Sequence, residues 1–317
     1  MTGLANKLGV LSGLSETVRT LTAAHKRPLE EMWFPSDAIV PLLDRVIAKD
    51  DEFTRQVAAI PMDLWAALVL HLLTEAGLPH FHRLIAQHLG EEHPWKEWNN
   101  LWTAEEDRHG MAIDQYILIT QVVNRNALEL MRFEYIDAGF HPKWGKDPYQ
   151  LLAYTVLQER ATQVSHKKLG TKIATYEPVF GKLLQRIAGD EARHYAFYKA
   201  VFLEVLEADA DEALQSLHTV MMHFTMPGAS APRFADLQEI EERSDIFTAA
   251  DYREIVATAI TLLGVADLKP KTDRGKKALD RILGVPKVLD RVVRDNAKKK
   301  AVKQTFAVPF LQRLITV

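Results

Sequence analysis

Apolar residues recur every three to four positions along most of this chain, which is the spacing of an amphipathic helix. No convincing run alternates apolar and polar residues in the manner of a strand. The fold is therefore predicted to be all-α, with one four-helix core and additional helices around it. The segments predicted to be helical are residues 40–48, 63–89, 98–127, 128–137, 150–169, 178–206, 218–226 and 249–263.

Proline, glycine and capping residues set the expected ends of these helices. The first sixty residues are expected to be irregular apart from the helix at 40–48. Asp63 is placed to cap the helix that follows it, and Pro79 is expected to kink the same helix. Further breaks are expected at residues 227–233, Lys269-Pro270, Gly284-Val285-Pro286 and Pro309.

Two Glu-x-x-His motifs lie inside the predicted helices, Glu106 with His109 and Glu191 with His194. Residues three apart share one face of a helix, so each pair can present a carboxylate and an imidazole to one ion. A single such pair arises about once by chance in a chain with twelve histidines. Both copies, however, follow the longer pattern of an acid, then Glu, any residue, Arg and His. The shared pattern favours a common role over coincidence.

A lone glutamate precedes each motif inside an apolar helical run. Glu75 lies 31 residues before Glu106, and Glu159 lies 32 residues before Glu191, so the order repeats at an offset of 84 to 85 residues. Taken singly, these residues are equally consistent with surface glutamates and core histidines. A buried, unpaired carboxylate costs several kcal/mol, however, and two divalent cations would balance four of them. Two Glu helices with two Glu-x-x-His helices are typical of ferritin-like di-iron and di-manganese bundles.

The residue types favour iron and suggest how its ligands are supported. Six ligands for two ions leave coordination positions open, and activation of dioxygen requires a redox-active metal, which zinc is not. Glu105 and Asp190 each precede a ligand glutamate and are expected to accept the free N–H of a metal-bound histidine. Thr162 lies one turn after Glu159 and is expected near the open side of the metals. Its hydroxyl can equally bond back to its own helix.

The composition limits where the electrons for a redox reaction could come from and where the protein is expected to be located. The chain has no cysteine, G-x-G-x-x-G or G-x-x-x-x-G-K-[ST] sequence, which excludes disulfides, thiolate metal sites and the common nucleotide and flavin fingerprints. A redox reaction would therefore take its electrons from another protein. No uninterrupted run of eighteen apolar residues and no secretion signal is present, so neither a transmembrane segment nor export is expected.

Charge is distributed unevenly along the chain. Residues 265–317 contain fourteen Lys/Arg and five Asp, a balance of +9, which leaves about −12 on residues 1–264 because the total is −3. A basic tail attracts nucleic acid, anionic membrane or an acidic protein, or is simply a solvated helix. We expect one domain, with a helical bundle over 1–264 and a basic extension over 265–317 packed on it.

Several stretches make the chain resemble the soluble plant-type acyl-carrier-protein desaturases. The likeness covers nearly the whole chain, and all six ligand positions of the family pattern are filled. The matching stretches are LTEAGLP (73–79), WTAEEDRHG (102–110), QERAT (158–162) with Ser165-His166, DEARH (190–194), Met221-Met222 with Met226-Pro227, and the basic tail up to Val308-Pro309-Phe310.

The resemblance implies a ferritin-like bundle, usually a homodimer, with two Fe²⁺ ions per subunit. The implied reaction is dioxygen-dependent insertion of a cis double bond into an acyl chain on acyl carrier protein, with electrons from ferredoxin, in fatty acid biosynthesis. Thr162 matches the family's threonine near the oxygen site, and Trp33 and Asp190 match its proposed electron route. The setting would be a bacterial cytoplasm, or the plastid stroma for a mature plant-type form. No nucleic acid partner is expected.

The resemblance also gives the basic tail a candidate partner. Acyl carrier protein is strongly acidic, and basic residues recur in the tail at helical spacing. Departures from the plant sequences leave acyl chain length and double-bond position open. The departing positions are Gly77, His80, Phe81, His82, Leu151 and Leu152. The residues expected to dock the carrier protein are Lys287, Arg291, Arg294 and Lys298.

Three other interpretations use the same residues. Another di-iron oxygenase, such as an arylamine N-oxygenase or a hydroxylase, would have the same six ligands and a different product. A ferritin-like protein would oxidise iron without an organic substrate. A helical scaffold would hold no metal at all.

Overall fold

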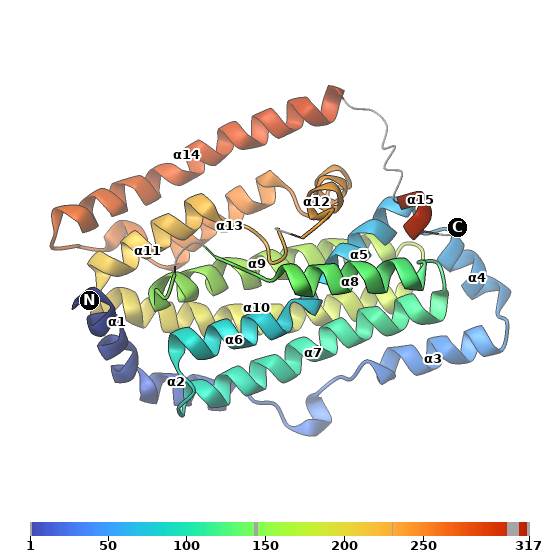
Figure 1. Cartoon of the computed structure of the whole chain (residues 1–317), viewed down its shortest axis with the longest axis horizontal. Helices are drawn as coiled ribbons and strands as arrows, with labels where there is room; N and C mark the ends of the chain where they lie inside the picture. The colour runs from blue at the N-terminus through green and yellow to red at the C-terminus, as the bar shows by residue number, and fades with distance from the viewer. Residues whose placement is uncertain (1, 143–144, 230, 303–310, 316–317) are drawn as a thin grey trace.

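The computed structural model describes residues 2–142, 145–229, 231–302 and 311–315. Within those ranges the chain is helical, and its only β-type pairing is an isolated bridge between Val123 and Ile315. The prediction of an all-α fold is confirmed. Figure 1 shows long helices lying roughly along one axis of the molecule, with shorter ones packed around them.

Four helices form the core. They are α5 (Met62–Ala76), α7 (Trp95–Thr120), α9 (Pro148–Ile173) and α10 (Pro178–Ala208). The last two are antiparallel neighbours that pack along their lengths, while α5 contacts both α7 and α9, and α7 contacts α10. The six predicted ligands, four glutamates and two histidines, therefore all lie on helices that face the same interior.

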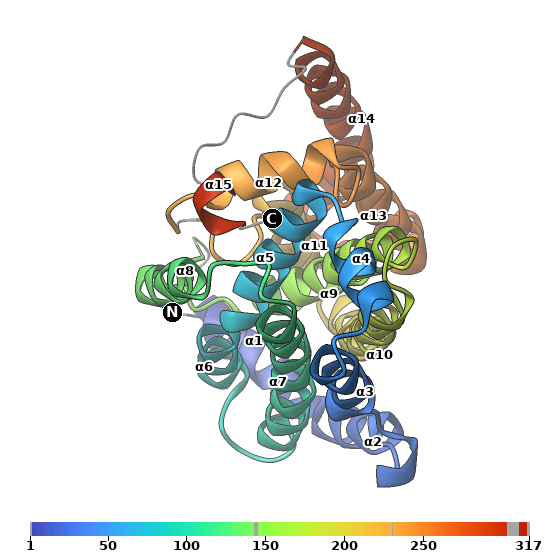
Figure 2. The same ribbon diagram turned by 90° about the vertical axis from the view of Figure 1, so that its right-hand side faces the viewer.

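The remaining helices cover this core on two sides. Figures 1 and 2 show α2 and α3 on the side of α7, and α14 on the opposite side, above α11 and α13. The bounds of these elements are α1 (Thr2–Gly13), α2 (Ser15–His25), η1 (Leu29–Glu31), α3 (Ser36–Ile47), α4 (Asp51–Ala58), α6 (Leu78–Leu89), α8 (Arg125–Ala138), α11 (Ala210–His223), α12 (Phe234–Arg243), α13 (Ala249–Leu262), η2 (Val265–Asp267), α14 (Asp273–Val302) and α15 (Leu311–Leu314).

The two longest core helices begin at strong sequence signals. Asp147 precedes α9 and accepts hydrogen bonds from the backbone N–H groups of the first turn, with Pro148 as the first helical residue. Glu177 does the same for α10, which begins at Pro178. A capping carboxylate followed by proline satisfies otherwise unpaired N–H groups and presets the helical φ angle. The predictions for these two helices and for α13 are confirmed to within a few residues.

The expectation for the first sixty residues is wrong, because most of this segment is helical. α1, α2 and α4 all lie where irregular chain was expected. Asp50 caps α4 by accepting from the backbone N–H groups of Glu52 and Phe53. α2 is only moderately apolar in sequence, yet it buries Val18 and His25 against the bundle. Tertiary burial, which a local pattern does not show, stabilises these helices.

The helix expected over 63–89 is two helices that meet at Gly77. Pro79 has no N–H to bond to the carbonyl group one turn earlier, which explains the break. Asp63 is not the cap; Pro61 occupies that position, and the Asp63 carboxylate accepts a hydrogen bond from the Ser244 hydroxyl at 2.7 Å. The stretch Met62–Leu89 is long and apolar enough to span a membrane by composition, but 72% of its most apolar window is buried inside the bundle.

Two boundaries further along the chain also differ from expectation. α7 ends at Thr120, where Gln121 adopts a left-handed conformation, and α8 begins separately after Asn124. The Asn124 side chain accepts from the backbone N–H of Ala127, which fixes the start of α8. The predicted division at residue 128 is therefore wrong.

The C-terminal third contains one unexpected helix and one helix longer than expected. α12, at residues 234–243, had no counterpart among the predicted helices. α14 continues through Gly284-Val285-Pro286, where a break was expected, because Ile282 and Val285 are buried where α14 packs on α11 and α13. That packing offsets the hydrogen bond that Pro286 removes. The expected break at Pro309 lies outside the described residues.

Candidate metal centre

The six predicted ligands converge in the middle of the core. All are buried, and they form two groups whose potential ligand atoms lie within 4.8 Å of one another. The bundle therefore brings together residues that are up to 119 positions apart, as Glu75 and His194 are. The first group is Glu75, Glu106, His109 and Glu191; the second is Glu106, Glu159, Glu191 and His194.

Two glutamates belong to both groups and direct one oxygen to each. Glu106 lies 3.6 Å from His109 Nδ1 through Oε2, and 2.8 Å from His194 Nδ1 through Oε1. Glu191 lies 3.3 Å from His109 Nδ1 through Oε1, and 3.7 Å from His194 Nδ1 through Oε2. Carboxylates with one oxygen on each side are what a carboxylate-bridged pair of metal ions requires.

The remaining two carboxylates lie at opposite ends of the cluster. Glu75 Oε2 is 4.0 Å from His109 Nδ1, and Glu159 Oε2 is 3.6 Å from His194 Nδ1. Close approach of α5 and α7 is possible because Gly110 has no side chain, since a Cβ there would lie 3.3 Å from Glu75 Cβ. Each group thus has one terminal glutamate, one histidine and two shared glutamates.

Several ligand atoms that face the centre of the cluster have no hydrogen-bond partner among the described residues. Buried polar atoms normally have such a partner, and leaving one unpaired is costly. A pair of cations satisfies these atoms and neutralises four carboxylates at once, so the residues fit a dinuclear metal site. The unpaired atoms are Glu106 Oε1, His109 Nδ1, Glu159 Oε2, both Glu191 carboxylate oxygens and His194 Nδ1.

In the absence of a cation, protons take its place. Burial raises the pKa of Glu75 and of Glu159 well above the ordinary range. Burial alone would lower the pKa of His109 and of His194, but interactions with carboxylates, above all the hydrogen bonds to Asp190 and to Glu105 respectively, outweigh it and raise both pKa values. The same two imidazoles overcome the effect of burial on Glu191 and lower its pKa. A metal ion that enters must therefore displace protons.

The outer face of His109 is held by a carboxylate from the other half of the repeat. Its Nε2 atom lies 3.4 Å from Asp190 Oδ2, which also accepts from the Trp33 indole N–H at 2.8 Å. Arg108 contributes a third contact to Asp190 at 3.2 Å and donates to the Trp33 carbonyl at 3.0 Å. A partner of this kind fixes the orientation of a metal-binding imidazole and increases its basicity.

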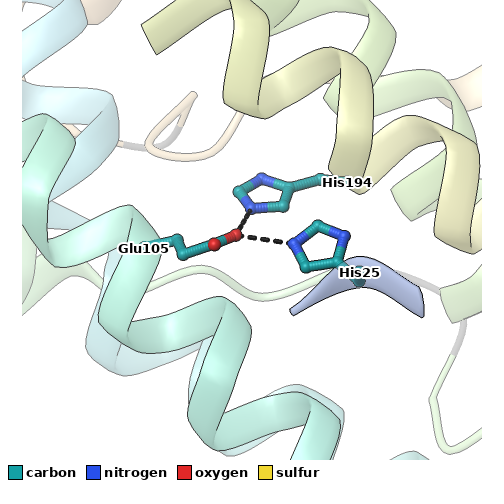
Figure 3. Close-up of side chains that lie close together, drawn as sticks. All are labelled: His25, Glu105 and His194. Atoms are coloured by element: carbon teal, nitrogen blue, oxygen red, sulfur yellow. Dashed lines mark hydrogen bonds and ion pairs between the residues drawn. The ribbon is translucent and has the colours of Figure 1, made fainter. Parts of the chain in front are cut away.

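His194 has an equivalent partner, shown in Figure 3. Its Nε2 atom lies 2.9 Å from Glu105 Oε2, and the same oxygen is 2.7 Å from His25 Nε2. Burial lowers the pKa of His25, so this imidazole is neutral and donates its single N–H to Glu105. These three residues also lie close enough to bind an ion. Because the hydrogen bonds already satisfy Glu105 and His194 directs its other nitrogen inward, they support the dinuclear site instead.

Two further contacts to the ligands were not foreseen. The Trp102 indole N–H donates to Glu159 Oε1 at 3.1 Å, and His166 Nε2 lies 2.9 Å from Glu75 Oε1. Both had a local signal: Trp102 is four residues before Glu106, and His166 is seven residues after Glu159, so each shares a helix face with a ligand. His25 had no such signal, because it comes from α2.

Thr162 is buried beside the cluster, but its hydroxyl hydrogen bonds remain within its own helix. The hydroxyl oxygen lies 3.2 Å from the Gln158 carbonyl and 3.1 Å from the Glu159 carbonyl. The side chain also lines the two small cavities nearest the cluster. This position is consistent with either of the roles considered for it from the sequence.

A groove lies at the surface between α12, α13 and α14. It has a volume of about 580 Å³ and is lined by Met226, Phe247, Tyr252 and, from α14, Lys299 and Lys300. It shares Met226 and Phe247 with a cavity of about 20 Å³ deeper in the protein. A third cavity, also of about 20 Å³, shares Thr162 with the second cavity and is lined by Glu75, Glu106 and Trp102.

The four basic residues expected to dock a partner do not join the metal cluster. Each lies on α14 and is exposed to solvent. Their spacing along the helix places them on one face. They are Lys287, Arg291, Arg294 and Lys298, and the last directly precedes Lys299 and Lys300, which line the groove.

Comparison with known proteins shows the family. The sequence profile of the fatty acid desaturases matches residues 6–312. A chloroplastic stearoyl-acyl-carrier-protein 9-desaturase of Gossypium hirsutum is 27% identical over 321 residues, covering 96% of this chain and 81% of that protein. An acyl-acyl-carrier-protein 6-desaturase of Thunbergia alata is 30% identical over 277 residues, covering 82% of this chain and 71% of that protein.

Two mycobacterial proteins extend the comparison. DesA1 of Mycobacterium tuberculosis, named as an acyl-carrier-protein desaturase, is 37% identical over 175 residues; the match spans 53% of this chain and 51%, about half, of that protein. An X-ray structure of DesA2 from strain H37Rv covers 85% of this chain with a TM-score of 0.60 and 21% identity, and 99% of DesA2 is aligned. That likeness supports the ferritin-like helical fold. With the family profile covering nearly its whole length, the chain belongs to the fatty acid desaturase family, as its motifs predicted.

Proposed function

We propose that this protein is an acyl-acyl-carrier-protein desaturase that inserts a cis double bond into a saturated acyl chain. The observation that carries the proposal is the pair of four-residue groups that share Glu106 and Glu191. The relatives named as acyl-carrier-protein desaturases support the substrate class. Two iron ions held by the six ligands would supply the ability to reduce dioxygen and oxidise an unactivated C–H bond.

The protein's own contribution is to position the acyl chain and to keep water away from it. The groove and the two cavities share lining residues between the surface and the ligand cluster, and an acyl chain would enter by displacing side chains such as Phe247 and Met226, because each cavity has a volume of only about 20 Å³. An acyl chain along this path would pass Thr162 and meet the cluster beside Trp102. Fixing two neighbouring methylene groups at that point determines where the double bond forms.

The electron donor, the oligomeric state and the cellular location are also part of the proposal. Ferredoxin would supply electrons, because the sequence contains no cofactor fingerprint of its own. Trp33 and Asp190 connect His109 to a surface depression that Arg27 and Arg186 line together with Glu31 and Asp37, and the electron donor would bind at this depression. A homodimer and a cytoplasmic or stromal location stay predictions.

Product analysis tests the proposed reaction. The protein, loaded anaerobically with iron, is incubated with dioxygen, ferredoxin, its reductase and stearoyl- or palmitoyl-acyl carrier protein, and the released fatty acids are separated by chromatography. We expect a cis-monounsaturated product in an amount that matches the electrons supplied. A hydroxylated product would favour another di-iron oxygenase. Oxidation of added iron alone, with both acyl substrates unchanged, would favour a ferritin-like role.

Charge reversal tests the docking surface on α14. Changing all four exposed cations to glutamate should raise KM for the acyl carrier protein substrate by roughly tenfold at low salt and reduce its salt sensitivity, while metal content stays the same. Lys96→Glu, an exposed charge reversal on α7 instead of α14, is the control and should leave KM unchanged. Unchanged kinetics in the quadruple variant would remove α14 from the docking surface.

A further inference from the structure

The ligand Glu75 is connected to α12, a helix outside the four-helix core, by a buried row of side chains. Glu75 Oε1 lies 2.9 Å from His166 Nε2 on α9, and His166 Nδ1 lies 3.1 Å from His71 Nδ1 on α5. His71 Nε2 lies 2.9 Å from Oε1 of Glu241 on α12. The Ser165 hydroxyl donates to the same Glu241 oxygen at 2.7 Å. All five side chains are at most 7% exposed.

This row gives the two oxygens of Glu75 different surroundings. Oε1 is in contact with His166, whereas Oε2 faces the cluster and lies 4.0 Å from His109 Nδ1. A hydrogen-bonding partner outside the metal site restricts rotation of a ligand carboxylate and so fixes its orientation. The row therefore determines which oxygen of Glu75 is presented to a metal ion.

The row is complete without a metal ion. Both ring nitrogens of His71 and of His166, and the Ser165 hydroxyl, have a hydrogen-bond partner. The two imidazole rings also pack edge to face, with 4.4 Å between their centroids and 79° between their planes. A buried polar network in which each member is satisfied is rigid and specifies one arrangement. The protein itself therefore sets the position of Glu75 before metal binding.

The far end of the row is fixed to the core. Leu237 and Ile240 are buried on one face of α12, which packs against α5. The Ser244 hydroxyl at the end of α12 donates to Asp63 Oδ2, near the start of α5, at 2.7 Å. Glu241 thus extends inward from a helix that is attached to α5 at several points, which makes it a firm anchor.

The other half of the metal site is supported differently. Glu159 Oε1 accepts from the Trp102 indole N–H at 3.1 Å, and an indole has no second polar group that could continue the row. Thr155 occupies the position equivalent to His71, four residues before the glutamate, and its hydroxyl donates to a carbonyl of its own helix at 2.9 Å. The row is therefore specific to the Glu75 half and is not part of the internal repeat.

We propose that Glu241 and His71 are positioning residues for the ligand Glu75, which they hold in place through His166. The proposal rests on the proposed function for the presence of two metal ions, and not for the identity of the substrate. Loss of this support should loosen one metal position and leave the other unchanged. Partners that contact a ligand directly alter metal affinity by roughly 10- to 100-fold, and Glu241 acts through two imidazoles, so we expect an effect at the lower end.

Two changes at Glu241 separate hydrogen bonding from packing. Glu241→Leu removes the contacts to His71 and Ser165, whereas Glu241→Gln keeps a side chain that can hydrogen bond to both. In calorimetric titration of the metal-free protein with Zn²⁺, without acyl substrate, the leucine variant should show one of two sites weakened by roughly tenfold. The glutamine variant should be close to wild type. Asp236→Asn, an exposed change on the same helix, is the matched control.

A second variant guards against a folding defect at α12. His71→Phe keeps an aromatic ring at its position but cannot hydrogen bond to Glu241 or His166, so it should weaken the same single site. Two normal sites in both Glu241→Leu and His71→Phe would overturn the proposal. A glutamine variant as weak as the leucine variant would also overturn it, because hydrogen bonding would then not be the cause.

Double variants identify which site is weakened. Asp190 supports His109, which lies in the same group of ligands as Glu75, so Glu241→Leu with Asp190→Asn should weaken one site further and leave the other normal. Glu241→Leu with Glu105→Gln should weaken each site once, because Glu105 supports His194. Equal weakening of both sites by Glu241→Leu alone would show general damage and contradict a positioning role.

The visible absorption of Co²⁺-loaded protein adds a measurement that a change in stability alone would not alter. The bands of one of the two ions should shift in Glu241→Leu and return in Glu241→Gln, because they depend on how the ligands are arranged. Wild-type protein that binds no metal ion would contradict the proposed function. Wild-type protein that binds two, with an unaltered leucine variant, would contradict only the positioning role.

Discussion

The two halves of the metal site are built from the same repeat but are completed differently. In each half, a histidine from one motif is held by the acid of the other motif: His109 by Asp190 and His194 by Glu105. The outermost partner comes from the N-terminal segment in both halves. It is the Trp33 indole in the first half and the His25 imidazole in the second.

The repeated arginines explain how one unrepeated segment serves both halves. Arg108 donates to the carbonyl of Trp33, and Arg193 donates to the carbonyl of His25. The repeat thus positions the backbone of the segment at two points, eight residues apart. The two halves therefore differ in the side chain that this segment places beside the acid, which is an indole in the first half and an imidazole in the second. The internal repeat supplies the residues that could bind two metals, while the N-terminal segment makes the surroundings of the two histidines different.

The largest expected effect comes from a residue that both halves share. Glu191→Gln removes a charge and one oxygen ligand from the shared bridge, so we expect fewer than one metal ion per chain and a loss of activity of roughly a thousandfold or more. Glu204→Gln, an exposed change on the same helix, is the control. Metal analysis and the product assay measure both. A variant that still binds two ions with wild-type affinity would show that the halves do not share Glu191.

Smaller and unequal effects are expected from the acids that serve one half each. Asp190→Asn should weaken metal binding at the His109 position, and Glu105→Gln at the His194 position, each by roughly 10- to 100-fold. Calorimetric titration with Fe²⁺ or Zn²⁺ would resolve one weakened and one normal site in each variant. Equal weakening of both sites in both variants would contradict the assignment of one acid to each half.

The pH dependence of metal binding tests whether the histidines of both halves are protonated when no metal is bound. The pKa values of His109 and His194 are raised well above 6.5 in the metal-free cluster, so both imidazoles still carry displaceable protons at neutral pH. Because each metal ion displaces the proton of one histidine, the affinity for the metal should increase roughly tenfold per pH unit, and the increase should continue above about pH 6.5. Calorimetry in buffers of different ionisation enthalpy counts the protons. Equal affinity at about pH 6 and about pH 8 would show that the cluster is proton-free.

The sequence predicted the core of this site better than its surroundings, and the reasons are physical. A buried charged ligand set leaves a repeated pattern in the chain, so Glu75 and Glu159 could be identified from the residues around them. His71 and His166 had helical spacing from ligands and could have been found in the same way. The contact of Glu241 with His71 could not, because Glu241 lies on α12, a short helix whose position depends on packing against α5.

Helix ends show the same division between local and tertiary causes. The starts of α9 and α10 follow from a capping acid and a proline, both visible in sequence. The helical N-terminal segment and the continuous α14 depend on burial against distant helices, which no local pattern contains. His25 therefore belonged to a segment expected to be irregular, and its contact with Glu105 became apparent only in the folded chain.

The central claim is that the buried acids and imidazoles form one site for two cations. The most direct test is an anaerobic titration of the metal-free protein with Fe²⁺, followed by Mössbauer spectroscopy of the ⁵⁷Fe-loaded sample. We predict saturation at two ions per chain and two slightly different high-spin ferrous environments, which reflect the two halves. Saturation at no ion or at one, with catalytic activity unaffected by chelation, would contradict the account.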